Sequence, residues 1–293
     1  MKNLLLFSVL AVIFFASCGE DDDVQQQQQE ELLTVPVKST LTTTTTNPGL
    51  TPLQALLHPF LPSESSDKSQ QDENTITTVF EYEGRLITNK TETIGSQVIN
   101  YTYYYRDEEA GLLDSIRGTQ NGAFYSVQTY SYNEQGKISE IKIYNQDREL
   151  THAESFFSYN GDYPVQVQTS DYNSEGEAVT MTGTVEFENG NFVALDLYTE
   201  DYYGVPYVFH SEVQYDDKNN PVINIRTVKS PMENKNNMLN YTTVVSFMGY
   251  DYQTLFTGNY TYNEEDFPIT SHLVTILPTS TTISDGTYEY EKK

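Results

Sequence analysis

The feature that most constrains the fold is a repeated pair of aromatic or β-branched residues, separated by one residue and followed by turn residues. The second members of five consecutive pairs fall at positions 105, 132, 159, 187 and 215, so the spacing is 27 or 28 residues. The full series of pairs is Phe80 and Tyr82, Tyr103 and Tyr105, Tyr130 and Tyr132, Phe157 and Tyr159, Val185 and Phe187, Val213 and Tyr215, Tyr260 and Tyr262, and Tyr288 and Tyr290. A fixed period of this length indicates one supersecondary unit repeated along the chain.

Each unit has the pattern of a β-hairpin. Turn residues follow the aromatic pair, as in Asn133-Glu134-Gln135-Gly136, and a second alternating segment then begins, as where Ile141 and Ile143 flank Lys142. Side chains two residues apart on a strand share a face of the sheet. The pattern therefore predicts strand, tight turn, strand, with one apolar and one polar face.

We accordingly predict an all-β fold, an antiparallel meander of roughly fourteen to sixteen strands within residues 75–293, because no helical period is evident there. An apolar sheet face must be covered, so the hairpins are expected to form a closed barrel, a flattened barrel or a curled sheet. Residues 229–258 break the period. They are expected to hold either a diverged unit around residues 241–247 or a longer loop.

A transmembrane barrel is an alternative, because alternation with a period of two also fits strands whose apolar side faces lipid. It ranks lower here because the apolar pairs are short, whereas spanning strands need about nine to eleven residues. The deciding observation is the face that the aromatic pairs occupy. Pairs that point inward indicate a barrel in water, and pairs that point outward indicate a barrel in the membrane.

The N-terminal segment is typical of an exported lipoprotein. Residues 4–16 are almost wholly apolar, which is long enough for a signal peptide and too short to span a bilayer. The following Phe15-Ala16-Ser17-Cys18-Gly19 resembles the lipobox of bacterial lipoproteins, and Cys18 is the only cysteine in the chain. We predict a signal peptide over residues 1–17 and a lipid on Cys18 that attaches the mature chain to a membrane.

The segment after Cys18 is predicted to be a tether. The acidic run Glu20-Asp21-Asp22-Asp23 resembles the surface-export signal of Bacteroidetes-type lipoproteins, which favours an outer-membrane location facing the cell exterior. Glutamine, threonine, proline and serine dominate the residues up to 74. Such segments bury little apolar surface, so residues 18–74 are expected to be disordered and residues 75–293 to form the folded domain.

The repeats also suggest a family. The pattern Tyr-x-Tyr-Asn-x-x-Gly at Tyr130–Gly136, and its relative at Tyr260–Pro268, resemble YD-type repeats. Together with the lipobox, they are similar to a family of Bacteroidetes lipoproteins of unknown function described as having a porin-like β fold. The resemblance covers about residues 75–293. It implies an all-β, surface-associated protein and supplies no catalytic residues.

Charge and motif content exclude several functions. The net charge of −26 repels phosphate backbones, so no nucleic-acid partner is expected. The four histidines show no metal-ligand spacing, and neither a Gly-x-Ser-x-Gly sequence nor a phosphate-binding glycine loop occurs. No catalytic residue, metal or cofactor is predicted, and no pair of carboxylates can be singled out for glycoside hydrolysis.

Five tyrosines depart from the inward pattern and are candidates for ligand binding by stacking on a sugar or contacting a protein. They are Tyr104, Tyr144, Tyr198, Tyr202 and Tyr203. Their alternative role is cross-strand packing on the wet face of the sheet. Asp114-Ser115-Ile116 resembles a short O-glycosylation sequon of exported proteins in this bacterial group, so Ser115 is a candidate modification site.

From the sequence we predict a lipid-anchored cell-surface protein without enzymatic activity, acting as a binding or structural module for a glycan or protein ligand. One alternative is a surface glycan-processing enzyme that uses a carboxylate pair. The other is a membrane-embedded β-barrel.

Overall fold

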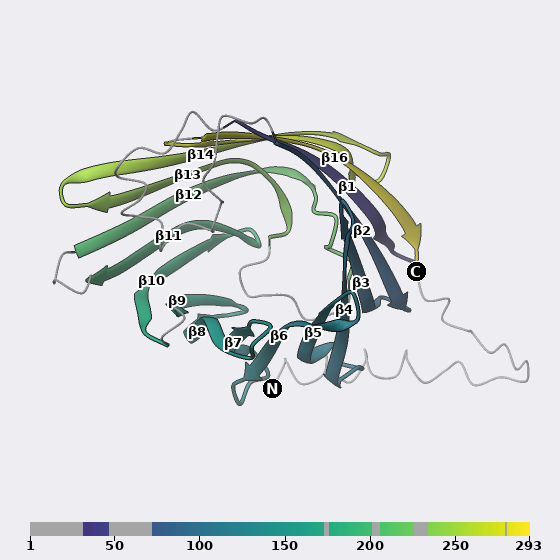
Figure 1. Ribbon diagram of the computed structural model, residues 1–293, viewed down its shortest axis with the longest axis horizontal. Coiled ribbons are helices and arrows are strands. Elements are labelled where there is room, and N and C mark those ends of the chain that lie inside the picture. Colours follow the sequence, from purple (N-terminus) through teal and green to yellow (C-terminus); the bar gives the residue numbers. More distant parts are fainter. Residues whose placement is uncertain (1–31, 47–71, 173–175, 201–205, 226–233, 279) are drawn as a thin grey trace, which may run out of the picture. The chain divides into compact units, whose positions relative to one another are not determined.

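The computed structural model describes residues 32–46, 72–172, 176–200, 206–225, 234–278 and 280–293. Within these ranges sixteen strands form a closed antiparallel barrel (Figure 1). The strands are β1 (Thr34–Thr46), β2 (Asp72–Glu83), β3 (Leu86–Ile94), β4 (Gln97–Asp107), β5 (Leu112–Gln120), β6 (Ala123–Tyr132), β7 (Ile138–Tyr144), β8 (Leu150–Asn160), β9 (Tyr163–Tyr172), β10 (Ala178–Glu188), β11 (Asn191–Glu200), β12 (Pro206–Asn219), β13 (Asn236–Phe247), β14 (Tyr250–Tyr262), β15 (Pro268–Leu277) and β16 (Ser280–Lys292). No helix in the described ranges is long and apolar enough to cross a membrane.

The strands follow one another around the barrel in chain order, and β1 closes it by pairing with both β2 and β16. The prediction of an all-β meander of repeated hairpins is therefore confirmed, and the apolar face is covered by closure of the sheet. The irregular stretch contains β13, which is the diverged unit expected around residues 241–247.

The predicted tether is wrong over β1, which consists of residues that the composition had assigned to a disordered segment. The threonine run pairs with hydroxyl side chains of β16. Thr43 Oγ1 lies 2.9 Å from Ser284 Oγ, and Thr45 Oγ1 lies 3.2 Å from Thr282 Oγ1. Threonine is β-branched and suits a pleated, half-wet surface. The run thus becomes a strand once partners exist on both sides, although it contributes little apolar area.

Strand length removes one argument against a membrane barrel. Every strand except the seven-residue β7 has nine to fourteen residues. That is enough for a tilted strand to cross a bilayer. The short apolar pairs of the sequence cover only part of each strand. The face that these pairs occupy therefore has to distinguish a barrel in water from a barrel in the membrane.

The turns confirm the role of asparagine after the aromatic pair. Asn133 Oδ1 accepts hydrogen bonds from the backbone N–H groups of Gln135 and Lys137, each at 3.0 Å. Asn263 does the same for Glu265 and Phe267, at 3.0 and 2.9 Å. A side-chain amide that replaces a backbone acceptor stabilises a tight turn, and Gly136 completes the first of these turns with a φ of 74°.

The two faces of the wall differ in composition. Along β14 the even-numbered residues from Tyr252 to Tyr262 are Tyr, Thr, Phe, Gly, Tyr and Tyr, whereas the odd-numbered ones from Asp251 to Thr261 are Asp, Gln, Leu, Thr, Asn and Thr. The register with β13 and β15 carries the same division to the neighbouring strands. One face is therefore aromatic and aliphatic, and the other is largely hydroxyl, amide and charged.

The apolar face points into the barrel. Side chains converge on the concave side of a curved sheet and spread apart on its convex side, so a large apolar side chain that is almost fully buried without a covering layer lies on the concave side. Ile141 and Leu113 on the apolar face are each 2 % exposed, and they belong to one cluster that runs from β5 to β12. Asp285 on the polar face keeps 68 % of its side-chain exposure. We call the two surfaces the inner face and the outer wall.

Candidate binding site at one end of the barrel

Tyrosines from the repeats form a ring of similar hydrogen bonds on the inner face. In each case the hydroxyl of the second aromatic residue donates to a backbone carbonyl of the preceding strand. The bonds are Tyr82 to Pro36 (2.6 Å), Tyr105 to Ile87 (2.7 Å), Tyr132 to Leu113 (2.8 Å), Tyr159 to Ile138 and Tyr290 to Pro268 (2.7 Å). They fix the rings against the wall and satisfy the buried phenols. The sequence pattern predicted that paired aromatic rings share one face of the sheet, left open whether that face is the inner one, and did not indicate their shared type of acceptor.

Two members of the series depart from this rule. The hydroxyl of Tyr215 is buried and has no hydrogen-bond partner within the described part of the chain. The hydroxyl of Tyr262 donates to the carboxylate of Asp216 and not to a carbonyl. Both residues lie near the end of the barrel where β12 and β14 finish and β13 begins. The tyrosine–carbonyl bond of the repeat is therefore replaced or lost at one place on the barrel.

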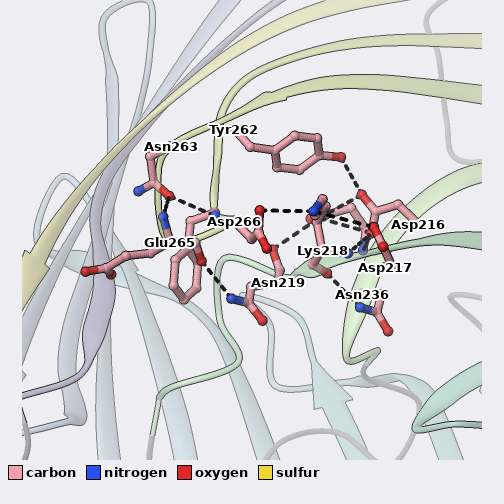
Figure 2. Close-up of polar contacts among 11 residues, drawn as sticks. Asp216, Asp217, Lys218, Asn219, Asn236, Tyr262, Asn263, Glu265 and Asp266 are labelled. Carbon is pink, nitrogen blue, oxygen red and sulfur yellow. Dashed lines mark hydrogen bonds and ion pairs between the residues drawn. The ribbon is translucent and has the colours of Figure 1, made fainter.

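Asp216 organises that place (Figure 2). Besides the Tyr262 hydroxyl, its carboxylate accepts the backbone N–H groups of Lys218 and Asn237, each at 3.0 Å, and the side-chain amide of Asn237 at 3.1 Å. Burial, followed by the Asp216 carboxylate, raises the pKa of Tyr262, so its phenol stays neutral and acts as a donor. One carboxylate thereby joins the ends of three strands.

Further polar contacts join this corner to the β14–β15 turn. Lys218 Nζ lies 3.1 Å from Asp266 Oδ1, and the Asn219 side chain donates to the Glu265 carbonyl at 2.9 Å (Figure 2). The pKa of Glu265 is lowered, first by its hydrogen bond to Lys292. These acidic residues are therefore held by specific partners.

The segment between β12 and β13, residues 220–235, is described at 220–225 and 234–235, and we call it the β12–β13 connection. Asn224 Nδ2 donates to the carbonyl of Thr34 on β1 at 2.8 Å, and the Asn224 carbonyl accepts Arg85 Nη1 at 3.4 Å. At its other end Asn234 Oδ1 accepts the N–H of Phe192 at 2.8 Å. The connection thus bonds to strands on both sides of its own hairpin.

A cavity of about 280 Å³ is lined by residues of the inner face and by described residues at the two ends of the connection. Its wall from the strands includes Tyr215, Met238, Tyr260 and Tyr288, and the connection contributes Asn220 and Pro221. Asn234, Asn236 and Asn237 complete the lining. The lining side chains are phenols, amides, a thioether and a proline ring, none of which carries a charge. No sequence pattern predicted this cavity, although asparagines cluster at both ends of the connection.

The tyrosines singled out from the sequence do not come together. Tyr104 in β4, Tyr144 in β7 and Tyr198 in β11 lie on strands that are not neighbours. Tyr104 and Tyr198 are exposed, and the Arg117 guanidinium lies 5.6 Å from the centre of the Tyr104 ring. Tyr202 and Tyr203 fall outside the described residues, as does Cys18. The ligand-binding role of these tyrosines stays a prediction.

Two other predicted features can be placed. Ser115 lies in β5 opposite Tyr104, and its hydroxyl is 3.4 Å from Asp114 Oδ2. Tyr104 also lines a second cavity of about 230 Å³ together with Glu83, the last residue of β2, and Glu108, in the turn after β4, both of which are exposed. The structure leaves glycosylation of Ser115 as a prediction.

The histidines of the barrel each face an aspartate on the neighbouring strand. His210 pairs with Asp196 at 2.6 Å and His272 with Asp285 at 2.7 Å, both on the outer wall. His152 pairs with Asp171 at 2.7 Å on the inner face, and its hydrogen bonds to Asp171 and then Glu154 raise its pKa to about 9. Within the described ranges no group of three or more His, Cys, Asp or Glu side chains is arranged to hold a metal ion.

Comparison of the sequence with family models and with curated proteins finds no match. Among solved structures, the chain is similar to a porin-like protein from Bacteroides uniformis, with a TM-score of 0.46, 14% identity, and coverage of 87% of this chain and 96% of that one. It is also similar to a porin-like protein from Bacteroides vulgatus, with a TM-score of 0.41, 11% identity, and coverage of 88% and 99%. The function therefore has to be argued from the residues of the barrel.

Proposed function

We propose that this chain is a non-enzymatic binding module of the outer membrane, held there by lipid on Cys18, with its barrel standing in water. The observation that carries the proposal is the division of side chains between the inner face and the outer wall. An apolar interior behind a polar exterior is the arrangement of a barrel whose solvent is water.

The outer wall carries charge in the middle of its strands. His210 and Glu212 lie within β12, Asp285 lies within β16, and Lys38 on β1 pairs with Glu289 at 2.7 Å. A lipid-facing wall needs an apolar band about 25 Å tall, and a cationic side chain at its middle costs about 2–4 kcal/mol. Threonines occupy much of the remaining wall of β1, β2 and β16, which fits water better than lipid.

A membrane-embedded barrel is the second candidate, and specific observations favour it. The barrel is closed, its strands are long enough to span, and β14–β16 expose Leu255, Ile276 and Ile283 on the outer wall. Both solved structures reported above are described as porin-like. In this candidate the exposed aliphatic residues contact lipid.

The absence of catalysis is also part of the proposal. Among the described residues that line the cavity of about 280 Å³ there is no carboxylic acid, histidine or cysteine. Glycoside hydrolysis needs two carboxyl groups at a set separation across a cleft. In the second cavity Glu83 ends β2 and Glu108 lies in the turn after β4, and both are exposed. If hydrolysis of a glycan were found and were lost in Glu83→Gln or Glu108→Gln, the enzyme alternative would replace the proposal.

Replacing the lipid anchor with a cleavable leader distinguishes a lipid-anchored barrel in water from a membrane-embedded barrel. We would export residues 19–293 behind a conventional cleavable secretory leader, beside the natural chain, and fractionate the cells. The proposal expects the natural chain in the membrane pellet and the exchanged chain, folded by circular dichroism, in the soluble fraction without detergent. An embedded barrel would sediment with membranes in both forms and need detergent in both.

A further inference from the structure

We propose that the second cavity, of about 230 Å³, binds a small organic cation that carries an ammonium group. We call it the β3–β4 cavity, and all of its lining residues lie in the described part of the chain. The inference rests on the binding role proposed above and names the ligand class of that role. Three observations carry it: a gap between two strands, two carboxylates without partners, and an aromatic lining without a cation.

The cavity lies where β3 and β4 separate. Their pairing ends at Asn89 opposite Thr102, although both strands continue beyond this pair. The lining includes Leu86 and Thr88 on the β3 side and residues 103–105, which are three consecutive tyrosines, on the β4 side. All five residues come from the segments beyond the last pair. The cavity is therefore formed by regular strands of the barrel wall.

Two carboxylates border the cavity. Glu83 ends β2, next to β3, and Glu108 follows β4, so the two side chains come from opposite sides of the gap. Both are exposed, and neither carboxylate forms a hydrogen bond or ion pair with another described residue. A carboxylate accepts hydrogen bonds and donates none when it is ionised. The pair therefore offers free acceptors and negative charge to a ligand.

No side chain of the chain supplies the matching positive charge. The lining holds no lysine, arginine or histidine. Arg85, which follows Glu83 by two residues, directs Nη1 to the Asn224 carbonyl at 3.4 Å, and the Arg106 guanidinium lies 5.3 Å from the centre of the Tyr132 ring. The net charge of −26 adds a long-range attraction for cations. A cation from solution can therefore occupy the cavity.

The lining favours an organic cation over a metal ion. Calcium takes roughly six to eight oxygen ligands, and magnesium requires a nearly octahedral set. Within the described ranges no group of three or more His, Cys, Asp or Glu side chains is arranged to hold a metal. An ammonium group is attracted both to carboxylates and to aromatic rings, and its carbon atoms suit the side chain of Leu86.

The size of the cavity limits the size of the cation. About 230 Å³ far exceeds the roughly 10–15 Å³ that a single water needs. It lies below the roughly 300 Å³ at which sites for drug-sized molecules begin. A group as small as choline or ethanolamine fits, and a longer chain attached to it has to extend into solvent.

One aromatic side chain of the lining is already fixed. The Tyr105 hydroxyl donates to the Ile87 carbonyl at 2.7 Å, which joins the two strands across the gap. Attraction between a cation and an aromatic ring involves the ring and leaves this bond intact. A side chain that is ordered before binding loses little entropy when a ligand arrives.

The test titrates the natural chain with choline, with ethanolamine and with the uncharged analogue of choline in which carbon replaces nitrogen. A non-ionic detergent would keep the chain dispersed without adding an ammonium group. Saturation-transfer NMR would follow the ligand protons. We expect saturable, millimolar binding of choline or ethanolamine and no binding of the analogue. Binding should weaken as sodium chloride is raised from about 20 mM to about 0.5 M.

Two double variants separate local contact from overall charge. Glu83→Gln with Glu108→Gln removes both carboxylates at constant size and should weaken binding about 3- to 10-fold. The matched control, Glu134→Gln with Glu188→Gln, removes two exposed glutamates of other hairpins and should change binding by less than about 2-fold. Both variants change the net charge equally, so a difference between them reports contact within the cavity.

A third variant tests the cavity by its volume. Thr88 is the extra residue where the register of β3 with β2 shifts, and it lines the cavity. Thr88→Phe adds a ring there and should abolish binding in a chain that keeps its circular dichroism spectrum. The glutamate variants, which preserve the shape of the cavity, decide the question if Thr88→Phe does not fold.

The inference is overturned if neither cation binds saturably, if the uncharged analogue binds as well as choline, or if the two double variants weaken binding equally. Saturable binding of calcium chloride that displaces the cation would also overturn it, because the carboxylates would then form a metal site. A chain that is soluble without its anchor and binds neither cation contradicts only this inference. A chain that stays in the membrane without its anchor and binds choline contradicts only the proposed placement.

Discussion

Phe156 and Phe157 are neighbours in β8 and lie in opposite environments. Phe156 is 5 % exposed in the cluster of the inner face, and Phe157 is 62 % exposed. The register between β8 and β9 shifts between Phe156 and Ser158, so Phe157 is the extra residue of a β-bulge. Backbone register therefore decides which face of the barrel wall a residue occupies, and hydrophobicity alone does not place a residue in the interior.

The two faces also satisfy their polar atoms differently. On the inner face Ser211, which is wholly buried, pairs with Thr243 at 2.9 Å, and the tyrosines donate to carbonyls. On the outer wall polar groups meet water or form exposed ion pairs such as Lys38 with Glu289. An inner polar group therefore depends on one named partner, and an outer one has water as a substitute.

The largest expected difference between the two faces is the loss of unfolding free energy when an aromatic side chain is replaced by alanine. Phe156→Ala removes a ring from the inner cluster and should lower the free energy of unfolding by about 3–5 kcal/mol. Phe157→Ala should lower it by less than about 1 kcal/mol. Urea denaturation followed by circular dichroism would measure both. Equal losses would contradict the assignment of the two faces.

A smaller difference is expected for single hydroxyl groups. Tyr132→Phe leaves the Leu113 carbonyl without its donor and should cost about 1–2 kcal/mol. Tyr104→Phe on the outer wall should change the unfolding free energy by less than about 0.5 kcal/mol. Thermal midpoints of the two variants against the natural chain would show the difference, and an unaffected Tyr132→Phe would make the ring of tyrosine–carbonyl bonds energetically irrelevant.

The inner histidine should make stability depend on pH. The pKa of His152 is raised to about 9 in the folded chain, mainly by Asp171, from the ordinary value near 6.5. Its contribution is therefore complete below about pH 6.5 and disappears as the pH rises through 9. Relative to His152→Gln, the natural chain should lose on the order of 1–2 kcal/mol between these limits, after allowance for partial exposure.

The control for this titration is His272→Gln on the outer wall, whose side chain is half exposed. It should change the unfolding free energy by less than about 0.5 kcal/mol. A His152→Gln variant whose deficit stayed constant between about pH 6.5 and about pH 9 would show that the His152–Asp171 pair does not stabilise the fold through its charge.

The smallest effect should come from the outer ion pairs. Lys38→Ala removes the cation opposite Glu289, and both side chains are well exposed. Such pairs contribute about 0–1 kcal/mol and are screened by salt. Any loss seen in denaturation at low ionic strength should vanish at about 1 M salt. A loss that persisted would mean that this part of the wall is shielded from water.

The sequence was sufficient for the repeated hairpins because their signals are local. Aromatic pairs with a period of two, and asparagines such as Asn133 that cap the turns, determine strand and turn with few distant contacts. The strand β1 was missed because a threonine run becomes a strand only through partners on β2 and β16. No local sequence pattern indicates those distant partners.

The cavity was missed for a related reason. The register between β12 and β13 shifts on both sides of Tyr215, and these shifts accompany the loss of the tyrosine–carbonyl bond at this point of the repeat. A shift of one residue leaves the spacing of aromatic pairs almost unchanged. Tyr215 therefore looks like every other member of the series in the sequence, although its hydroxyl has no acceptor among the described residues.

The pairing of β1 with β16 has a consequence for the order of events during synthesis and export. Thr34 lies opposite Lys292, so one of the first described residues finds its partner among the last. Until β16 has emerged, β1 and the newest strand both present open edges, which are templates for pairing with other chains. The seam thus makes barrel closure a late event, and a carrier that shields those edges during transport would protect the chain from aggregation.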